Sequence, residues 1–385
     1  MARIHPFRAL RYTPRAGDVA RLATLPYDVI PEDLERDYKA RSPYNFAHLI
    51  LPRGDYAGVA ARLGQWKREG VIAGDESEAV FVYEQSFPAP GGETLVRRGF
   101  IALGDTEPYG ETVFRHERTL SGPKEDRFRL LEATRVQFDS IFMLFPDAGQ
   151  KVERMLAGMA AQPPEIEYED HQRTRHRLWR VAEAAWIEAL KEAMVDKKLL
   201  IADGHHRYET ALRMGQARTM MTFVALESPG LRCFATHRLV HSLPQFDAAA
   251  FLAALPNLAP GLEPLSPPPG HVRIGVVTGA GEHRTDIPAA EPALNVVVLQ
   301  EAVLSPLLGL TPDRVAAGGH LAYTRSREEA REAVRAGRAQ IAFLLEDLPV
   351  AGLARAAFAG QVLPQKSTYF YPKLASGLVM YELPA

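Results

Sequence analysis

One stretch constrains the chain more than any other: KLLIADGHHRYETAL, residues 197–211, where polar side chains follow directly on an apolar run. The run 199–202 is typical of the end of a buried strand, and the residues after it favour a helix. Gly204 stands between the two, where a sharp turn and the close approach of a ligand are easiest. Because the start of a helix presents free N–H groups and a partial positive charge, the stretch predicts a phosphate-binding turn.

The side chains of this turn supply complementary chemistry. Arg207 can form paired hydrogen bonds with phosphate oxygens, and His205 and His206 add donors or a proton acceptor near neutral pH. Adjacent histidines point different ways from a helix, so we expect at most one to reach a ligand directly. Asp203 is placed to cap the helix, orient a histidine or bind a metal ion. Mg²⁺ suits this single carboxylate better than zinc, because the spacing differs from the helical His-Glu-x-x-His arrangement.

Length and composition exclude several classes of protein. A chain of 385 residues is long enough for a sizeable core and two domains. The formal net charge of -2 gives no overall attraction to nucleic acid or to an anionic membrane, so we expect neither as a partner. The single cysteine, Cys233, excludes an internal disulfide and a cysteine-based zinc cluster. Since no apolar run could span a membrane and no signal peptide begins the chain, we expect a cytoplasmic protein.

Hydrophobic periodicity and turn residues indicate how the chain is organised. Two aromatic-rich runs flank Gly91 and Gly92 and predict a β-hairpin over 79–103. A proline-dense stretch, 256–270, is typical of a loop or linker. We therefore expect an α/β or α+β fold with a mixed-sheet main domain. The predicted divisions are a main domain over 1–241, a smaller α/β unit over 242–358, and a tail over 359–385 that returns to the site.

Other polar stretches carry further candidate residues, and each has two interpretations. Residues 113–131 form either a substrate-binding loop or a solvated loop with salt bridges. Residues 364–373, which end in Lys373, either bind an anion or dock an aromatic tail, and they lack the glycines of a P-loop. The acidic and amide residues in the strand predicted near 84–85 are candidates to line a pocket. The site candidates from these stretches and the N-terminal region are Asp28, Glu117, Lys124, Arg127, Lys366, Ser367 and Thr368.

Motifs distributed along the chain resemble one family. They include HPFRAL, PYDVI, PYNF, YEQSF, GFIAL, HERT, IADGHHRYETAL and PQKSTYFYPK, and they run from residue 4 to about 378. On these motifs the chain is identified as a member of the family called domain of unknown function 1015. No G-x-S-x-G, Rossmann G-x-G-x-x-G or kinase signature set is present, so the sequence does not support a serine hydrolase or a dinucleotide dehydrogenase.

The turn also resembles the nucleotide-binding turn of the ParB/sulfiredoxin superfold, which includes free-serine kinases, ATP-using sulfiredoxins and CTP-binding partition proteins. Gly204, His206 and Arg207 match the glycine, histidine and arginine of that turn, while His205 occupies its variable position. The nucleophilic cysteine of sulfiredoxins is not matched, and we find no helix-turn-helix segment like that of partition proteins. The comparison with the serine kinases is the one that the residues of this chain fit best.

The resemblance implies a small-molecule kinase that transfers a phosphoryl group from ATP, ADP or pyrophosphate, with Mg²⁺, to a free hydroxy amino acid such as L-serine. Such a reaction needs positive charge, a metal ion and a carboxylate base. Asp28, Glu117 or Glu84 could be the base; Asp28 is preferred because kinases of the superfold place an acid early in the chain. His206 is a further catalytic candidate. A non-catalytic nucleotide-binding regulator and a phosphohydrolase remain alternatives, and a homodimer is left open.

Overall fold

The computed structural model describes residues 1–385 apart from 90–91, 118–120, 264–266, 291–292, 365 and 385, and it leaves out the side chains of 121–124. The chain forms two compact units. The first unit comprises Met1–Arg115, Leu120–Leu231 and Pro372–Ala385. The second comprises His116–Thr119 and Arg232–Tyr371. The chain therefore crosses from one unit to the other several times, and its last residues belong to the first unit.

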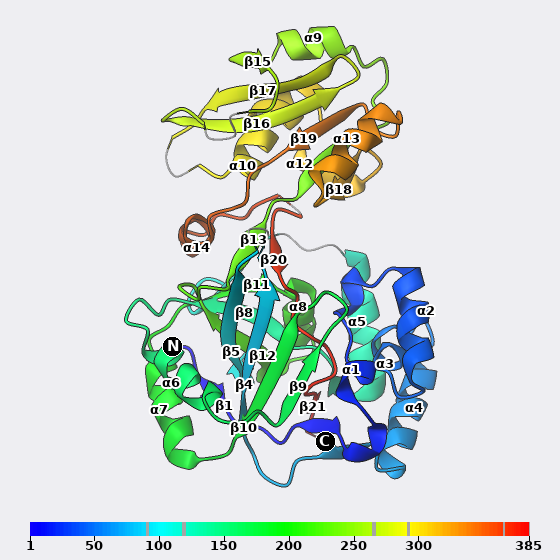
Figure 1. Cartoon of the computed structure of the whole chain (residues 1–385), viewed down its shortest axis with the longest axis vertical. Helices are drawn as coiled ribbons and strands as arrows, with labels where there is room; N and C mark the ends of the chain where they lie inside the picture. The colour runs from blue at the N-terminus through cyan, green and yellow to red at the C-terminus, as the bar shows by residue number, and fades with distance from the viewer. Residues whose placement is uncertain (90–91, 118–120, 264–266, 291–292, 365, 385) are drawn as a thin grey trace. The chain divides into compact units, whose positions relative to one another are not determined.

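A mixed sheet forms the centre of the first unit (Figure 1). Nine strands of the described residues take part, in the order β6-β11-β8-β12-β5-β4-β10-β9, with β1 paired to β5. Strand β11 is parallel to β6, β8 is parallel to β12, and the other pairs are antiparallel. The strands are β1 Ile4–His5, β4 Val80–Pro88, β5 Thr94–Asp105, β6 Val113–Phe114, β8 Ile141–Phe145, β9 Ile166–Glu169, β10 Arg175–Val181, β11 Leu199–Asp203 and β12 Arg218–Ala225.

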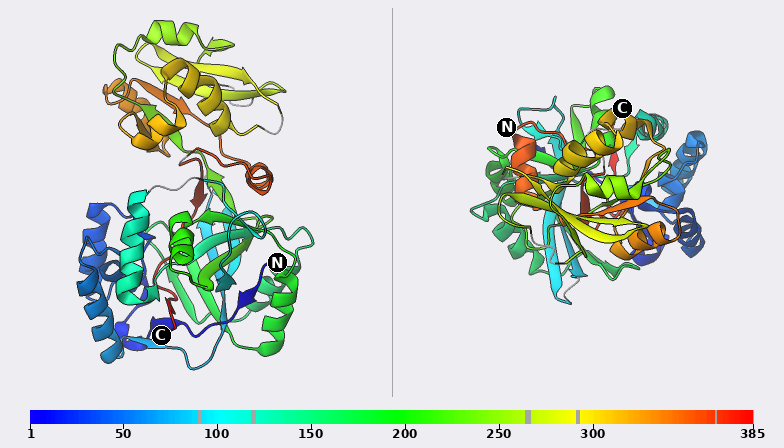
Figure 2. Two further views of the ribbon diagram at one scale, coloured as in Figure 1. Left: turned by 180° about the vertical axis from the view of Figure 1, so that it is seen from behind. Right: turned by 90° about the horizontal axis from the view of Figure 1, so that it is seen from above.

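Helices pack against this sheet because its strands are apolar on both faces. Along β4, Val80 and Val82 belong to the core cluster that also includes residues of α6 (Lys151–Ala160) and α7 (Ala184–Met194). The side chain of Tyr83 therefore lies on the opposite face, following the two-residue period of a strand. Figures 1 and 2 both place α6 and α7 together on one side of the sheet. The predicted hairpin over 79–103 is confirmed by the antiparallel pairing of β4 and β5.

A second core cluster lies under the N-terminal helices of the first unit. Short strand pairs, β2 (Leu10–Tyr12) with β3 (Ile72–Gly74) and β7 (Val136–Gln137) with β21 (Tyr381–Glu382), border it. The helical elements are η1 Pro14–Ala16, α1 Val19–Leu22, η2 Tyr27–Val29, α2 Glu32–Arg41, α3 Ala47–Ile50, α4 Tyr56–Arg68, α5 Ser121–Thr134 and α8 His205–Arg213. The C-terminal strap, residues 372–384, passes Thr24, whose backbone exchanges two hydrogen bonds with that of Ser376, at 3.1 and 2.9 Å.

The second unit is built on an antiparallel sheet in the order β15-β17-β16-β19-β14-β18 and a separate pair, β13 with β20. Its sheet includes β14, which precedes residue 242, the start of the smaller unit predicted from the sequence. The strands are β13 Arg232–Phe234, β14 His237–Val240, β15 Leu258–Pro260, β16 His271–Thr278, β17 Gly281–Pro288, β18 Leu321–Thr324, β19 Ile341–Leu344 and β20 Tyr369–Tyr371. The helices are α9 Ala248–Ala253, α10 Asn295–Leu299, the π-helical turn η3 Gln300–Leu304, α11 Ser305–Leu308, α12 Pro312–Ala317, α13 Arg327–Arg335 and α14 Val350–Phe358.

The observed architecture is a mixed α/β fold, as the sequence predicts. The strand–turn–helix unit is present, because β11 is followed at once by α8. Among the described residues, no helix combines the length and the apolar character that a membrane-spanning segment requires.

Candidate functional site

The predicted turn lies at the carboxyl end of β11, and Gly204 makes it possible. Gly204 has φ +93° and ψ 26°, a left-handed conformation that side chains other than glycine rarely adopt. A Cβ atom on Gly204 would also lie 2.9 Å from Nε of Arg207, so the guanidinium group packs directly against the glycine. The turn therefore needs glycine for its backbone conformation and for the space that Arg207 occupies.

We predict that Gly204→Ala destabilises the protein by about 1–2 kcal/mol, the cost of a left-handed non-glycine residue. The added Cβ should also displace the guanidinium of Arg207 and so weaken the phosphate binding that the sequence predicts, an effect separate from the backbone strain. Urea denaturation measures the first effect and calorimetric titration with ADP measures the second. Gly215→Ala is the matched control for backbone strain alone. Gly215 lies exposed just after α8 with φ +66°, and a Cβ atom added there would meet no atom beyond its chain neighbours within 4 Å.

Asp203 does not cap the helix, which corrects one of the roles expected for it. Gly204 is the N-cap residue and no side chain caps α8; one Asp203 carboxylate oxygen instead accepts a hydrogen bond from the Gly204 N–H at 2.9 Å. The other oxygen accepts a hydrogen bond from Nζ of Lys373 at 2.8 Å. The Lys373 side chain is 10% exposed and that of Asp203 is 22% exposed, so the ion pair is largely withdrawn from water.

The charges around Asp203 fix its protonation state. Burial alone would raise the pKa of Asp203, but the positive charges of Lys373 and Arg207 and the hydrogen bond from Lys373 outweigh burial and hold the pKa well below its usual range. Asp203 is therefore an anion at neutral pH. Lys373 belongs to the stretch 364–373, for which anion binding is one of the two interpretations. Its pairing with Asp203 was not predicted, because nothing local in the sequence connects the two residues.

Arg207 is held at the centre of the site. Its Nη1 donates a hydrogen bond to the backbone carbonyl of Ser140, in the loop before β8. Burial alone would lower the pKa of Arg207, but the carboxylates of Asp139, Asp203 and Asp28 raise it, so the guanidinium stays charged. An arginine fixed by a backbone carbonyl and surrounded by carboxylates is positioned before any ligand arrives.

Asp28 reaches the same group of charges from the short helix η2. The residue as a whole is solvent-exposed, yet protein surrounds its carboxyl group closely enough that desolvation raises the pKa of Asp28. The negative charge of Asp203 raises this pKa further, while Lys373 and Arg207 lower it. The site thus holds two carboxyl groups whose pKa values move in opposite directions. Such a pair can divide the roles of proton acceptor and fixed anion.

Arg127 contacts the segment that carries Asp28, and its predicted role in binding phosphate stays a prediction. Its guanidinium carbon lies 3.9 Å from the centre of the Tyr27 ring, and its Nη1 donates a hydrogen bond to the carbonyl of Ile50 at 3.0 Å. Asp126 accepts two further hydrogen bonds from the same guanidinium. The side chain of Lys124, the neighbouring candidate, lies outside the described residues.

His205 and His206 occupy the first turn of α8, and both are partly buried. His205 is near enough to Asp203 for its charge to lower the pKa of that carboxyl group. The carbonyl of His206 accepts a hydrogen bond from Thr210 at 2.8 Å. Which of the two imidazoles would contact a ligand stays a prediction.

Four predicted residues belong to the second unit and lie together there. The N–H of Lys366 donates a hydrogen bond to Glu117 at 3.1 Å, and Ser367, which is fully buried, donates its hydroxyl hydrogen to the carbonyl of Pro364 at 2.5 Å. Thr368 hydrogen-bonds His116 at 2.8 Å. These contacts order the loop before β20, and their role in ligand binding stays a prediction.

One other expectation is corrected by the contacts of a carboxylate. Glu84 is 1% exposed, and both of its oxygens accept hydrogen bonds from arginines, Arg98 at 2.6 Å and Arg177. It is therefore a structural ion-pair partner and not a base. The expectation that Asp203 binds a metal ion stays a prediction; in this structure one of its oxygens accepts a hydrogen bond from Lys373 and the other from the backbone N–H of Gly204. Among the described residues, no group of three His, Cys, Asp or Glu side chains is arranged to bind a metal ion.

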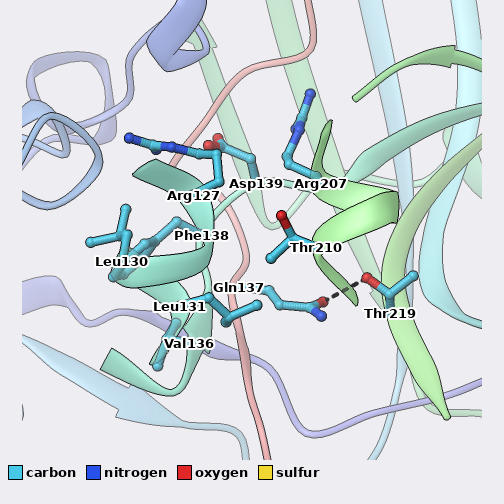
Figure 3. A pocket seen from close by; sticks show the side chains of 10 residues that line it. All are labelled: Arg127, Leu130, Leu131, Val136, Gln137, Phe138, Asp139, Arg207, Thr210 and Thr219. Carbon is cyan, nitrogen blue, oxygen red and sulfur yellow. Dashed lines mark hydrogen bonds between the residues drawn. The ribbon is translucent and has the colours of Figure 1, made fainter. Parts of the chain in front are cut away.

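A small cavity of about 50 Å³ lies beside Arg207, between α5 and α8. Figure 3 shows Arg127, Asp139 and Arg207 at one end of it and Leu131 and Val136 at the other. A space of this size holds water but no nucleotide. This cavity is therefore not a nucleotide site.

The fold and the turn place the chain in a class: it is a mixed α/β protein in which a glycine joins a buried strand to the start of a helix. The chain belongs to the family described as "Protein of unknown function (DUF1015)", which matches residues 4–300. This match confirms the family identified from the motifs. Among curated proteins, no sequence matches the chain.

Solved structures with a similar arrangement of elements are distant in sequence. A free serine kinase in complex with AMP is 14% identical, with 72% of this chain and 93% of that chain covered and a TM-score of 0.40. A conserved hypothetical protein from Pyrococcus furiosus is 12% identical, with coverage of 71% and 91% and a TM-score of 0.39. C-terminally truncated SbnI from Staphylococcus aureus is 11% identical, with coverage of 71% and 84% and a TM-score of 0.40. At these scores, the chemistry of this chain has to be argued from its own residues.

Proposed function

We propose that the protein is a small-molecule kinase that transfers a phosphoryl group from ATP, ADP or pyrophosphate to a free hydroxy amino acid such as L-serine. The observation that carries the proposal is the convergence of Asp28, Asp203, Arg207 and Lys373 at the start of α8. The two cations can hold a phosphate chain, and the carboxyl group with the raised pKa can accept a proton. The identity of the acceptor follows the resemblance of the turn to that of free-serine kinases.

The residues divide the work of the reaction as follows. The first N–H groups of α8 point at an anion placed over the turn, and Arg207 adds a planar set of donors. Lys373, held by Asp203, supplies a compact positive charge beside the phosphoryl group. The acceptor hydroxyl forms the new bond to phosphorus, the bond between phosphorus and the leaving phosphate oxygen breaks, and the hydroxyl proton passes to Asp28. Mg²⁺ would accompany the polyphosphate through phosphate oxygens, since Asp203 is committed to Lys373.

The proposal is tested by incubating the full chain and Mg²⁺ with ATP, ADP or pyrophosphate and a pool of free amino acids. Mass spectrometry should show one new phosphorylated amino acid, which depends on the donor and on the protein. Tight nucleotide binding with no product from any donor would indicate a non-catalytic regulator. Release of inorganic phosphate from added phosphoserine, without the forward reaction, would indicate a phosphohydrolase.

We predict that Arg207→Ala weakens binding of ADP by about 1–3 kcal/mol, the scale of lost charge-assisted hydrogen bonds. Isothermal titration calorimetry measures the change. Arg213→Ala is the matched control, because this arginine lies on the same helix but its guanidinium pairs with Glu125 and stacks on Phe128. Equal affinities for the wild-type protein and Arg207→Ala would remove Arg207 from the binding site.

A further inference from the structure

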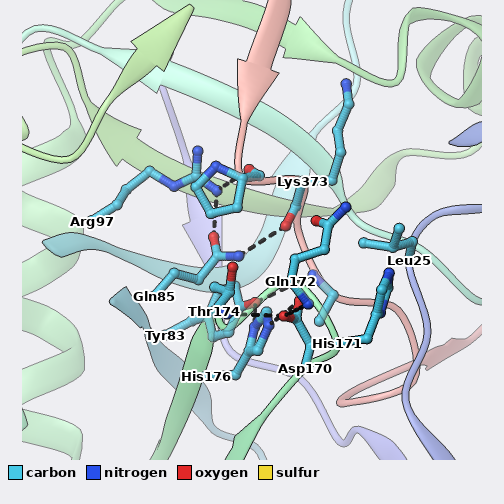
Figure 4. A network of polar contacts seen from close by, with 12 residues as sticks. Leu25, Tyr83, Gln85, Arg97, Asp170, His171, Gln172, Thr174, His176 and Lys373 are labelled. Atoms are coloured by element: carbon cyan, nitrogen blue, oxygen red, sulfur yellow. Dashed lines mark hydrogen bonds and ion pairs between the residues drawn. The ribbon is translucent and has the colours of Figure 1, made fainter. Parts of the chain in front are cut away.

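The segment that carries Lys373 is bound through its backbone by two buried polar side chains. Gln85 of β4 donates a hydrogen bond from Nε2 to the carbonyl of Lys373 at 2.8 Å. Arg97 of β5 donates to the carbonyl of Pro372 at 2.5 Å and also to Oε1 of Gln85. Figure 4 shows Arg97 hydrogen-bonded to Gln85, and Gln85 hydrogen-bonded to the backbone of Lys373, while the side chain of Lys373 points away from both. The backbone on both sides of the Lys373 Cα atom is therefore held in place by these hydrogen bonds.

The pairing of the strands explains why these two residues act together. Gln85 and Arg97 are directly opposite in the antiparallel register of β4 and β5. Cross-strand neighbours of this kind project from the same face, so both side chains reach the strap. The next pair in the register, Glu84 with Arg98, projects from the opposite face, and its two side chains form an ion pair with each other. The sheet thus directs one polar pair at the strap and a second pair away from it.

Burying Gln85 and Arg97 costs free energy, which indicates that the two side chains have a role other than stabilising the fold. Gln85 and Arg97 are each 1% exposed, and burial lowers the pKa of Arg97 to about 10, so the guanidinium is still charged at neutral pH. Burying charged and polar groups costs free energy, and well-packed apolar residues often stabilise a fold at least as well. What an apolar pair cannot do is fix the position of two backbone carbonyls.

A second anchor holds the strap on the far side of Lys373. The hydroxyl oxygen of Tyr83 accepts a hydrogen bond from the N–H of Ala375 at 3.2 Å. The same hydroxyl lies 2.6 Å from Nδ1 of His176, whose Nε2 lies 3.1 Å from Asp170. Figure 4 shows this second network next to the first. Lys373 is thus fixed from both directions along the chain, and its side chain spans the remaining distance to Asp203.

We propose that Gln85 and Arg97 are positioning residues that fix Lys373 against Asp203, an inference that rests on the proposed phosphoryl-transfer function of this site. They do not touch the reacting groups. Their effect passes through the backbone of Pro372 and Lys373 to the Lys373 ammonium group, and from there to the two carboxyl groups of the site.

The test uses Gln85→Leu and Arg97→Met in the full chain, with Arg97→Lys as the conservative variant that keeps one donor. Glu84→Gln is the matched control, since it alters an equally buried polar residue on the opposite face of the same strand. The first readout needs no ligand: the rate at which Lys373 is acylated by an N-hydroxysuccinimide ester, followed by mass spectrometry. We expect this rate to rise about tenfold in Gln85→Leu and Arg97→Met, to rise less in Arg97→Lys and to stay unchanged in Glu84→Gln.

The second readout is the pH profile of kcat/KM for phosphoryl transfer. The charged and titratable groups near Asp28 are Asp203, Lys373, Arg207, Tyr27 and, stacked on that tyrosine, Arg127. When Lys373 withdraws, the acidic limb should move to higher pH by about one unit, because a nearby positive charge no longer favours the ionised form of Asp28. General loss of folded protein lowers the rate without moving this limb, as Glu84→Gln should show.

The two readouts separate the two possible failures. If the wild-type protein transfers no phosphoryl group, the proposed function is wrong, and the acylation rates still decide whether Gln85 and Arg97 position Lys373. If Lys373 reacts equally fast in Gln85→Leu, Arg97→Lys and the wild-type protein, the positioning role is overturned whatever the activity. Should Arg97→Met fail to fold, Gln85→Leu and Arg97→Lys supply the same comparison.

Discussion

Replacing Asp28 by asparagine is expected to lower kcat for phosphoryl transfer by about 10²–10⁴-fold, the usual contribution of a positioned general base. The amide has the shape of the carboxylate but cannot accept the hydroxyl proton. Affinity for ADP should change little, because Arg207, Lys373 and the start of α8 remain in place. Initial rates with the acceptor and donor identified by mass spectrometry, together with calorimetric ADP binding, measure both quantities.

The free energy of unfolding gives an independent check on Asp28→Asn, because the direction of its change can be predicted. Because the pKa of Asp28 is raised in the folded protein, its ionised form is disfavoured by folding, and this cost appears as the pH rises above the ordinary pKa of an aspartate. The neutral amide carries no such cost, so the Asp28→Asn variant should be at least as stable as the wild-type protein at neutral pH. Asp33→Asn, an exposed acid at the start of α2, is the control. Loss of activity with equal loss of stability would contradict a catalytic role for Asp28.

The sequence was sufficient for features that depend on neighbouring residues. Alternating apolar residues and a glycine pair predict the β4–β5 hairpin, and the apolar run before Gly204 predicts the end of β11 and the start of α8. The glycine itself follows from local stereochemistry, since a left-handed residue between a strand and a helix is easiest for glycine. The presence of Asp203 and Arg207 at one turn could therefore be predicted without any knowledge of tertiary contacts.

The sequence was insufficient where the site depends on residues far apart in the chain. Lys373 and Asp203 are 170 positions apart, and no periodicity connects them. Arg127 was predicted from its residue type alone, and the ring and the backbone carbonyl that its guanidinium contacts are visible only in the structure. Glu84 looks like an unpaired acid in a strand, but two arginines on neighbouring strands neutralise it. In each case the deciding partner comes from strand order or from the path of the strap, neither of which a single sequence reveals.

Lys373→Met is expected to lower the free energy of unfolding by about 3 kcal/mol at neutral pH, the low end for breaking a buried ion pair. The low end applies because the Asp203 side chain is 22% exposed and because Arg207 still stabilises its charge. Urea denaturation of the two proteins measures the difference. Phosphoryl transfer should also be lost, since the variant removes one of the two cations at the site.

The pH dependence of this difference identifies its cause. In the wild-type protein the pKa of Asp203 is depressed, so the ion pair contributes its full stability above the ordinary aspartate pKa of about 3.9 and loses it as the pH falls towards the depressed value. In the Lys373→Met variant, burial still raises the pKa of the Asp203 carboxyl group and the charge of Arg207 still lowers it, but the contribution of Lys373 is lost. The difference in the free energy of unfolding between the wild-type protein and Lys373→Met should therefore become smaller as the pH falls below about 4. Asp203→Asn and the double variant complete a cycle that should show coupling of the two residues. A gap that stays constant over the whole pH range would mean that Lys373 stabilises the strap by packing alone, and the ion pair would then have no part in ordering the site.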